Sequence, residues 1–363
     1  MSDFPFSKRT DWSLQNNPLS LALEKLHNQG THILDLTESN PTRCGFVYPR
    51  LWLEAFTNQN NLTYTPEAKG IGLARRAIAD YYQRKRITIS SDKIILTSST
   101  SEGYSFLLKL LTNPGDHVLV PKPSYPLFQF LLELHDVESD YYPLVYNGAW
   151  SIDRQAFRSL MTVQTKAVIL VNPNNPTGSY VNADDMAFLN EQCLKNHMAI
   201  ISDEVFFDYQ LNTHINPYSL CLNNEVLTFV LSGISKILGL PQMKLSWIAV
   251  NGPNTIVDTA MQRLEIIADT YLSVNAPVQN ALASWLMEES LVQKQILDKV
   301  NQNISTLHQH NLKPLAVDGG WYAVIHKPFI KSEESFVLSL LEQEQVLVHP
   351  GFFLILIKKD TWF

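Results

Sequence analysis

Short apolar runs alternate with longer amphipathic stretches between about residue 92 and residue 250. The runs are rich in Val, Ile and Leu, which predicts strands that are buried on both faces. They are Ile94–Thr97, Val118–Pro121, Ala167–Val171, Ala199–Ser202, Thr228–Leu231 and Trp247–Val250. Helical patterns lie between them at Glu102–Leu111, Leu127–His135 and Ala183–Asn196. This α/β alternation predicts a mostly parallel sheet with helices on both faces.

The two ends of the chain follow a different pattern. Ser20–Asn28 and Gly72–Arg86 have the period of helices, and Asn254–Gln309 is mostly helical with one long segment from about Val278. Short strands return at Trp321–Ile325 and Gln345–Val348. We therefore predict a three-layer α/β/α large domain over residues 46–265. A smaller α+β domain is expected from both ends, residues 1–45 and 266–363.

Composition narrows the class of protein. The 363 residues are 45% hydrophobic, enough for a large core, and 28 Lys and Arg stand against 35 Asp and Glu. The net charge of -7 argues against a nucleic-acid partner, whose phosphates need cations. Three scattered cysteines without a CxxC pair predict neither disulfides nor a zinc site, and they fit a reducing compartment. With no apolar leader and no run of about 18 apolar residues, we expect a cytoplasmic protein without a membrane segment.

Candidate chemistry follows the strands, because ligands bind beyond the carboxyl ends of parallel strands. Ser98–Glu102 is a hydroxyl-rich turn that opens a helix, where free N–H groups suit a phosphate, although an ordinary helix cap uses the same residues. Asn172–Gly178 contains two Pro, three Asn and a Gly, which predicts a rigid loop. Such a string is more specific than a plain turn requires.

An acid and a lysine follow the next two strands. Asp203 leaves a hydrophobic strand, where a carboxylate is costly unless a cation pairs with it, although a helix cap is the alternative. Lys236 lies between apolar residues, where burial lowers the pKa of a lysine and favours the neutral amine that attacks carbonyls. A phosphate turn, a partner for a ring nitrogen and an imine-forming lysine at one sheet edge point to pyridoxal 5'-phosphate.

With these residues in view, the sequence resembles the class I/II aminotransferases of the fold-type I pyridoxal-phosphate enzymes. The resemblance runs from about Asp35 to Phe353. Its motifs are Tyr64-x-Pro66-x-x-x-Gly70 with Arg75, Pro121-x-Pro123-Ser124-Tyr125-Pro126, Asn172–Gly178, Asp203-Glu204-Val205, Ser235-Lys236 with Lys244, and Val346-x-Val348-x-Pro350-Gly351. It implies an enzyme that moves an amino group between an amino acid and a 2-oxo acid by a ping-pong mechanism.

The resemblance also implies a role for each matching residue. Lys236 forms the imine with the cofactor aldehyde and then shuttles the proton at the substrate Cα. Asp203 keeps the pyridine nitrogen protonated, Asn175 donates to the phenolate oxygen O3′, and Tyr125 stacks on the ring. The expected phosphate ligands are Thr100, Ser101, Ser235 and Lys244, together with Tyr64 from the neighbouring subunit. A shared active site of this kind implies a homodimer.

Three residues of the cofactor site depart from the family pattern. Phe206 stands where many relatives have a tyrosine that hydrogen-bonds O3′. Lys244 replaces the more usual arginine, so it offers a point charge without bidentate geometry. Gly233 stands where several relatives have a phosphate-binding serine.

The end of the sequence departs as well. Many relatives carry an arginine after the Pro-Gly turn that binds the substrate carboxylate, whereas here no arginine follows Arg263. The apolar run that begins at Phe352 replaces the polar loop expected there. We therefore expect the carboxylate to bind near Ser39 and Asn40, with Arg43 as a possible cation.

Two other functions remain open from the sequence. A β-lyase or synthase of the same fold uses the same lysine, aspartate and asparagine, and a truncated, inactive homologue could bind the cofactor without catalysis. Searches for GxxxxGK[ST], HExxH and GxSxG find nothing in the chain, and no metal site is expected. The aromatic residues are scattered, and most are expected in the core.

Overall fold

The fold is built on one large sheet with eight strands in the order β2-β9-β8-β7-β6-β3-β4-β5. The computed structural model describes residues 4–272, 274–326 and 332–354. The strands are β2 Ile94–Thr97, β3 His117–Lys122, β4 Glu138–Tyr146, β5 Trp150–Ile152, β6 Thr165–Val171, β7 Ala199–Asp203, β8 Thr228–Gly233 and β9 Ser246–Asn251. Only β5 and β9 run antiparallel to their neighbours. The predicted mostly parallel sheet is confirmed.

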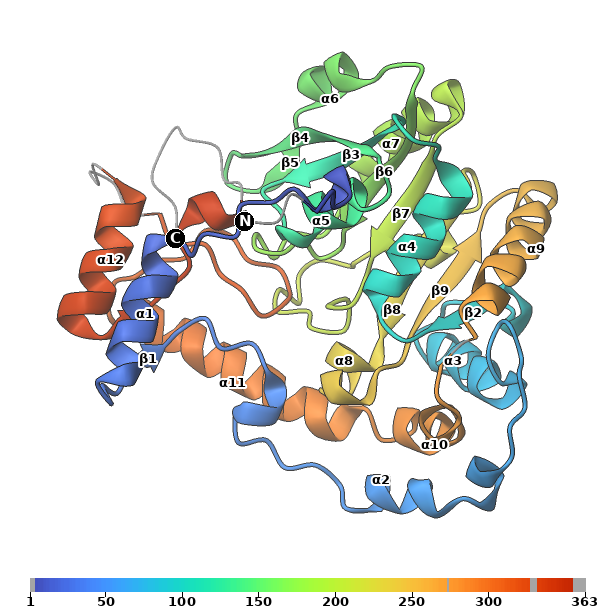
Figure 1. Ribbon diagram of the computed structural model, residues 1–363, viewed down its shortest axis with the longest axis horizontal. Coiled ribbons are helices and arrows are strands. Elements are labelled where there is room, and N and C mark those ends of the chain that lie inside the picture. Colours follow the sequence, from blue (N-terminus) through green and yellow to red (C-terminus); the bar gives the residue numbers. More distant parts are fainter. Residues whose placement is uncertain (1–3, 273, 327–331, 355–363) are drawn as a thin grey trace.

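Helices cover both faces of this sheet and make three layers (Figure 1). Successive residues of a strand point to opposite faces, so Phe229 and Leu231 join the apolar cluster of one face and Val230 that of the other. The first face is covered by α4 Thr100–Leu111, α5 Leu127–Glu133 and α9 Asn254–Thr270. The second is covered by α3 Gly72–Arg84, α6 Arg154–Leu160, α7 Ala183–Asn196 and α10 Ala276–Leu286. The α/β/α prediction is therefore confirmed.

The two ends of the chain meet in a separate lobe, seen at the left of Figure 1. There β1 Leu34–Asp35 pairs in parallel with β10 Val346–Leu347. Helix α1 Pro18–Asn28 packs on α12 Glu333–Glu344 around a small apolar cluster of its own. The long helix α11 Ser290–Gln309 precedes this lobe. The domain limits at residues 45 and 265 stay a prediction.

Two sequence predictions about elements are wrong. Trp321–Ile325 is not a strand, and only an isolated bridge joins Ile325 to Pro314, because the backbone just before this segment hydrogen-bonds loops of the large domain. The helix expected from Val278 onward is broken between Leu286 and Ser290. At that break Glu288 accepts a hydrogen bond from the Trp52 indole at 3.0 Å.

Strands β4 and β5 were not predicted from the sequence. Strand β4 mixes polar and aromatic residues, and its burial is partial along most of its length, so it lacks the apolar run of a central strand. Within the part of the chain that the structure describes, no helix is both long and apolar enough to cross a bilayer. The same residues contain no group of three or more His, Cys, Asp or Glu side chains that could hold a metal ion.

Candidate active site

The register of the sheet brings the predicted chemical segments to one edge. Thr97 at the end of β2 pairs with Ser246 of β9, which pairs in turn with Gly233 at the end of β8. On the other side of β8, Leu231 pairs with Asp203, and Asp203 pairs with Val171 at the end of β6. The hydroxyl turn, the lysine, the aspartate and the asparagine loop therefore start from neighbouring strand ends.

Lys236 lies one turn beyond β8, in the short helix α8 Ile234–Ile237. Its Nζ is 4.8 Å from the ring centroid of Trp321 and 5.2 Å from that of Phe206. Its backbone carbonyl accepts a hydrogen bond from the Tyr209 hydroxyl at 2.6 Å, which fixes the helix that carries it. Burial lowers the pKa of Lys236 to about 8, so far more of its amine is neutral near physiological pH than in an exposed lysine.

Asp203 is the opposing charge. One of its oxygens accepts from the Val205 backbone N–H and the other from the Tyr104 hydroxyl, both at 3.2 Å. Burial raises the pKa of this carboxyl to about 6, although these two donors and the charge of Lys236 act against the rise. The Asp203 carboxylate and the Lys236 ammonium form no ion pair in the described part of the chain, and their charges influence each other only over a longer distance. Both groups are therefore able to act on a ligand.

This buried carboxylate is expected to cost the cofactor-free protein stability. Since the pKa of Asp203 is higher in the folded state (about 6) than its ordinary 3.8, the folded state holds the proton more tightly. The wild type should lose stability as the pH rises from about 4 to about 6. Asp203→Asn should therefore raise the free energy of unfolding by about 2–3 kcal/mol at pH 8 and leave it nearly unchanged at pH 4.

Urea unfolding of the cofactor-free protein at both pH values measures this difference. Asp258→Asn is the matched control, because Asp258 is exposed on α9 and should change the free energy of unfolding by less than about 0.5 kcal/mol. An equal gain at pH 4 and pH 8 would contradict the assignment to ionisation of Asp203.

The predicted phosphate ligands gather around the start of α4. Ser99 caps this helix by accepting from the Glu102 N–H at 3.1 Å, and Glu102 reaches back to the Ser98 N–H at 2.6 Å. Thr100 and Ser101 occupy the first turn, where N–H groups have no partner within the helix. Because these groups and the positive end of the helix dipole face one place, the turn suits an anion.

The end of β8, just before α8, lies very close to the start of β9. A Cβ built on Gly233 would lie 2.3 Å from the Ser246 hydroxyl oxygen, so glycine at 233 is required by packing rather than by the phosphate. Ser235 is partly buried beside Lys236, and Lys244 is exposed in a left-handed conformation just before β9. The predicted ligands therefore come from three segments of the same edge.

One side chain of the asparagine loop has a polar atom without a hydrogen-bond partner among the described residues. Asn172 uses its amide to hold Tyr218 and Val181, and Asn174 bonds Pro123 and Thr177, so both hold the loop in shape. Asn175 is only 8% exposed, yet its side-chain oxygen has no hydrogen-bond partner among the described residues. A buried amide end without a partner is costly, which marks Asn175 as the member of the loop that meets a ligand.

The remaining predicted site residues are partly or largely exposed, and some already have hydrogen-bond partners within the chain. Ser39 and Asn40 are partly buried, but the Asn40 oxygen already accepts from the N–H and hydroxyl of Thr42 at 3.1 and 2.7 Å. Arg43 is mostly exposed, 3.9 Å from Glu38. Tyr125 is 48% exposed and Tyr64 77% exposed, so both rings are available to ligands or to another chain. Of the apolar run at the end of the sequence, residues 355–363 lie outside the described residues.

Three aromatic residues of the site, Trp321, Tyr104 and Tyr209, were not predicted from the sequence, which placed most aromatic residues in the core. Trp321 packs its ring against Phe206 and Tyr209, with centroids 5.2 and 4.9 Å apart. Tyr104 bonds Asp203, and Tyr209 bonds the Lys236 carbonyl. Their only signal in the sequence is proximity to the motifs, since Tyr104 follows the hydroxyl turn by one helical turn and Tyr209 follows the Asp203 motif.

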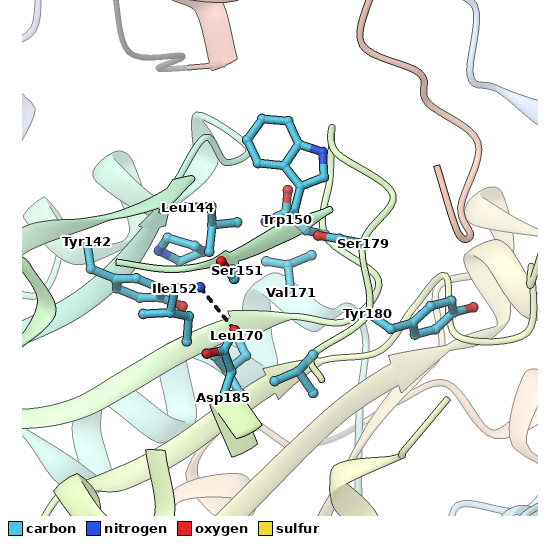
Figure 2. A pocket seen from close by; sticks show the side chains of 13 residues that line it. Tyr142, Leu144, Trp150, Ser151, Ile152, Leu170, Val171, Ser179, Tyr180 and Asp185 are labelled. Carbon is cyan, nitrogen blue, oxygen red and sulfur yellow. Dashed lines mark hydrogen bonds between the residues drawn. The ribbon is translucent and has the colours of Figure 1, made fainter. Parts of the chain in front are cut away.

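A separate pocket lies behind the asparagine loop. Strands β4, β5 and β6 form its floor and Ser179 and Tyr180 line its rim (Figure 2). Asp185 closes one side and accepts a hydrogen bond from the Ile152 N–H at 3.0 Å, which ties the β4–β5 hairpin to α7. Neither Lys236 nor Asp203 lines this pocket, so it is distinct from the candidate site.

Comparison with known proteins gives a consistent result. The family model described as "Aminotransferase class I and II" matches residues 31–363. A glutamate-pyruvate aminotransferase, AlaA, of Haemophilus influenzae is 28% identical over 340 residues, covering 90% of this chain and 84% of that protein. A tyrosine aminotransferase of Dictyostelium discoideum is 26% identical over 305 residues, covering 79% of this chain and 72% of that protein.

Solved structures agree on the fold. An aminotransferase from Escherichia coli superposes with a TM-score of 0.86 at 23% identity, covering 99% of this chain and 93% of that one. An alanine aminotransferase from Pyrococcus furiosus has a TM-score of 0.85 at 23% identity, covering 96% of this chain and 92% of that one. The arrangement of helices around the sheet is therefore shared over nearly the whole length.

Proposed function

The chain belongs to the aminotransferase class I and II family, and from this membership we propose that it transfers amino groups with pyridoxal 5'-phosphate as its cofactor. The observation that carries the proposal is Lys236, whose amine has a pKa lowered to about 8 by burial and lies at the same sheet edge as Asp203. An imine-forming lysine must be neutral to attack, and a charged ring nitrogen needs an anionic partner.

The residues present fit this cofactor. Asn175 is buried in the asparagine loop, its side-chain oxygen has no partner among the described residues, and its amide N–H group is the end that can donate to a ring oxygen. Asp203 offers a carboxylate that accepts two hydrogen bonds and, within the described residues, has no ion-pair partner. The start of α4 offers unpaired N–H groups beside Thr100 and Ser101 for a phosphate.

Each residue then has one task. When bound, the cofactor supplies an electron-withdrawing ring that stabilises negative charge at the substrate Cα. Lys236 Nζ takes the proton from the substrate Cα in one half-reaction and returns a proton to the substrate Cα in the other. Asp203 holds a proton on the ring nitrogen, Asn175 donates to the ring oxygen, and the ring of Tyr125 packs on the cofactor face. The proposed phosphate ligands are Thr100, Ser101, Ser235, Lys244 and, from a second copy, Tyr64.

We propose amino acids and 2-oxo acids as the substrates. The relatives are named for alanine, for glutamate and pyruvate, and for tyrosine, so these donors and acceptors are the first to test. A homodimer in the cytoplasm is the proposed form of the enzyme, and the exposed Tyr64 supports a shared site. Light scattering of the purified holoenzyme tests whether it is a dimer. The cofactor affinity of Tyr64→Phe tests whether Tyr64 of the second copy contributes to the site.

The activity test uses the visible spectrum of the holoenzyme. Addition of an accepted amino acid should bleach the absorbance of the bound cofactor in the visible range. A 2-oxo acid should then restore this absorbance and be converted to a new amino acid. Borohydride reduction and peptide mapping should place the cofactor on Lys236. Release of ammonia with pyruvate would indicate a lyase instead, and bound cofactor that no donor bleaches would indicate an inactive homologue.

Phe206→Tyr is expected to lower the pKa of the visible transition of the holoenzyme by roughly one unit. A phenol at position 206 can donate to the ring oxygen and stabilise its deprotonated form, which the phenyl ring present in this chain cannot do. Spectrophotometric pH titration measures the shift. Phe207→Tyr, at the next position in the sequence, is the control and should leave the transition where it is; an unchanged pKa in both variants would refute the proposed place of Phe206.

A further inference from the structure

The amine of Lys236 lies against two aromatic rings that come from different parts of the chain. Its Nζ is 4.8 Å from the centroid of the Trp321 ring and 5.2 Å from that of the Phe206 ring. The two rings meet edge to face, with centroids 5.2 Å apart and planes inclined by 71°. An ammonium ion within about 6 Å of a ring centroid is attracted by the negative ring face, more strongly where water is excluded. The two rings therefore suit the charged form of this amine.

No anion holds this ammonium ion directly. In the described part of the chain Lys236 Nζ makes neither a hydrogen bond nor an ion pair, and the charged group that acts on it, the Asp203 carboxylate, does so at longer range. A carboxylate in contact with a lysine favours its protonated form strongly, whereas a ring face offers a weaker attraction. The weaker attraction suits an amine that must both take and return a proton.

Backbone hydrogen bonds fix the position of Trp321. The N–H of Gly319 donates to the Gly178 carbonyl at 2.8 Å. The N–H of Gly320 donates to the Tyr209 carbonyl, also at 2.8 Å. A Cβ built on Gly178 would lie 2.7 Å from the Gly319 carbonyl oxygen, so a side chain at position 178 would prevent this close contact. Because Trp321 follows Gly320 directly, loops of the large domain determine where its ring lies.

Two tyrosines pack on the rings beside the amine. The ring of Tyr209 lies 4.9 Å from that of Trp321, and its hydroxyl donates to the Lys236 carbonyl at 2.6 Å. Tyr322 stands perpendicular to Phe206, with centroids 5.9 Å apart. Tyr209 therefore contacts both the ring of Trp321 and the backbone that carries the amine, which fixes the distance between them.

We propose that the Trp321 and Phe206 rings form a binding site for the Lys236 ammonium ion, and that Trp321 is a positioning residue for proton transfer. This inference rests on the proposed aminotransferase function. When Lys236 Nζ takes the proton from the substrate Cα, the C–H bond breaks, its electron pair stays with the substrate, and the nitrogen becomes positively charged. The ring faces stabilise this charge and hold the ammonium ion in place until it returns a proton.

The test weakens the attraction while the ring keeps nearly the same size. Tryptophans with increasing numbers of fluorine atoms, up to tetrafluorotryptophan, have a progressively less negative ring face, and they replace Trp321 in the full-length, cofactor-free protein. The pH dependence of acetylation of Lys236, followed by peptide mass spectrometry, gives its pKa, because only the neutral amine reacts. The wild-type pKa should be about 8. Tetrafluorotryptophan should lower it by about one unit, a tenfold weaker affinity for the proton, with the intermediate variants in order.

The same fluorinated residues at position 285 are the matched control. Trp285 is fully buried and packs on Trp52, with centroids 6.1 Å apart, instead of on an amine, so the pKa of Lys236 should keep its wild-type value. A pKa of Lys236 that is unchanged across the series at position 321, or that shifts equally with the series at position 285, would overturn the binding site.

A second measurement tests the part that Trp321 plays in proton transfer. Single-turnover transfer by the holoenzyme should slow by about two- to tenfold across the series at position 321, in the same order as the pKa of Lys236 falls, because a weaker base takes a proton more slowly. An unchanged rate with a lowered pKa would overturn the positioning role. A wild type whose cofactor absorbance no amino acid bleaches would instead overturn the aminotransferase proposal, and the acetylation result would stand apart from it.

Discussion

Lys236→Ala is expected to slow amino-group transfer by about 10⁴-fold or more, the upper range for loss of a general acid–base group. The variant loses the only amine that lies over the Phe206 and Trp321 rings at the end of β8 among the described residues. Binding of donor should survive, because the carboxylate and phosphate contacts are made by other residues. Stopped-flow absorbance of a single turnover measures the rate without interference from product release.

Lys236→Arg separates charge from proton transfer. The guanidinium keeps the positive charge but does not give up its proton near neutral pH, so this variant should be as inactive as the alanine variant. Lys109→Ala is the control, since Lys109 is an exposed lysine on α4 and should leave the rate within about twofold. A rate for Lys236→Ala within tenfold of the wild type would remove the basis of the proposed mechanism.

The chemical residues at the strand ends could be predicted from the sequence because a charged residue next to an apolar run is unusual. Asp203 and Lys236 each interrupt or closely follow an apolar run, and a charge in that place has few structural explanations. The parallel arrangement then fixes where they meet, since the carboxyl ends of parallel strands share one edge. The observed register, with Asp203 opposite Leu231, gives that expectation a concrete geometry.

The aromatic residues could not be found in this way, because a buried ring beside a ligand and a buried ring in the core have the same sequence pattern. Trp321 and Tyr322 reach the site only through backbone bonds to Gly178 and Tyr209, which lie more than a hundred residues earlier in the chain. Long-range contacts of this kind leave no local periodicity. The segment was therefore mistaken for a strand, and β4, the strand next to the edge, was missed for the related reason that its partial burial gives no clear alternation.

Asp203→Asn is expected to lower the rate constant of transfer by about 10³-fold, comparable to the loss of one well-placed electrostatic group in an active site. The amide keeps the size of the side chain, and its oxygen can still accept the Val205 N–H, so the fold should be retained. It carries no negative charge, however, and cannot hold a proton on the ring nitrogen. Glu204→Gln is a close control, since the adjacent carboxyl is also buried but accepts hydrogen bonds from Ser202, Ser219 and the Leu220 N–H.

The pH dependence of cofactor affinity distinguishes a charge effect from a packing effect. Since burial places the pKa of Asp203 at about 6 in the free protein, the carboxylate is present above that pH and is lost as the pH falls through it. Wild-type affinity should decline below about pH 6, because a protonated carboxyl does not pair with a charged ring. Asp203→Asn should bind weakly at every pH without this decline, and Glu204→Gln should keep it. If the decline persists in Asp203→Asn, another group carries the titration and the pairing with the ring nitrogen is wrong.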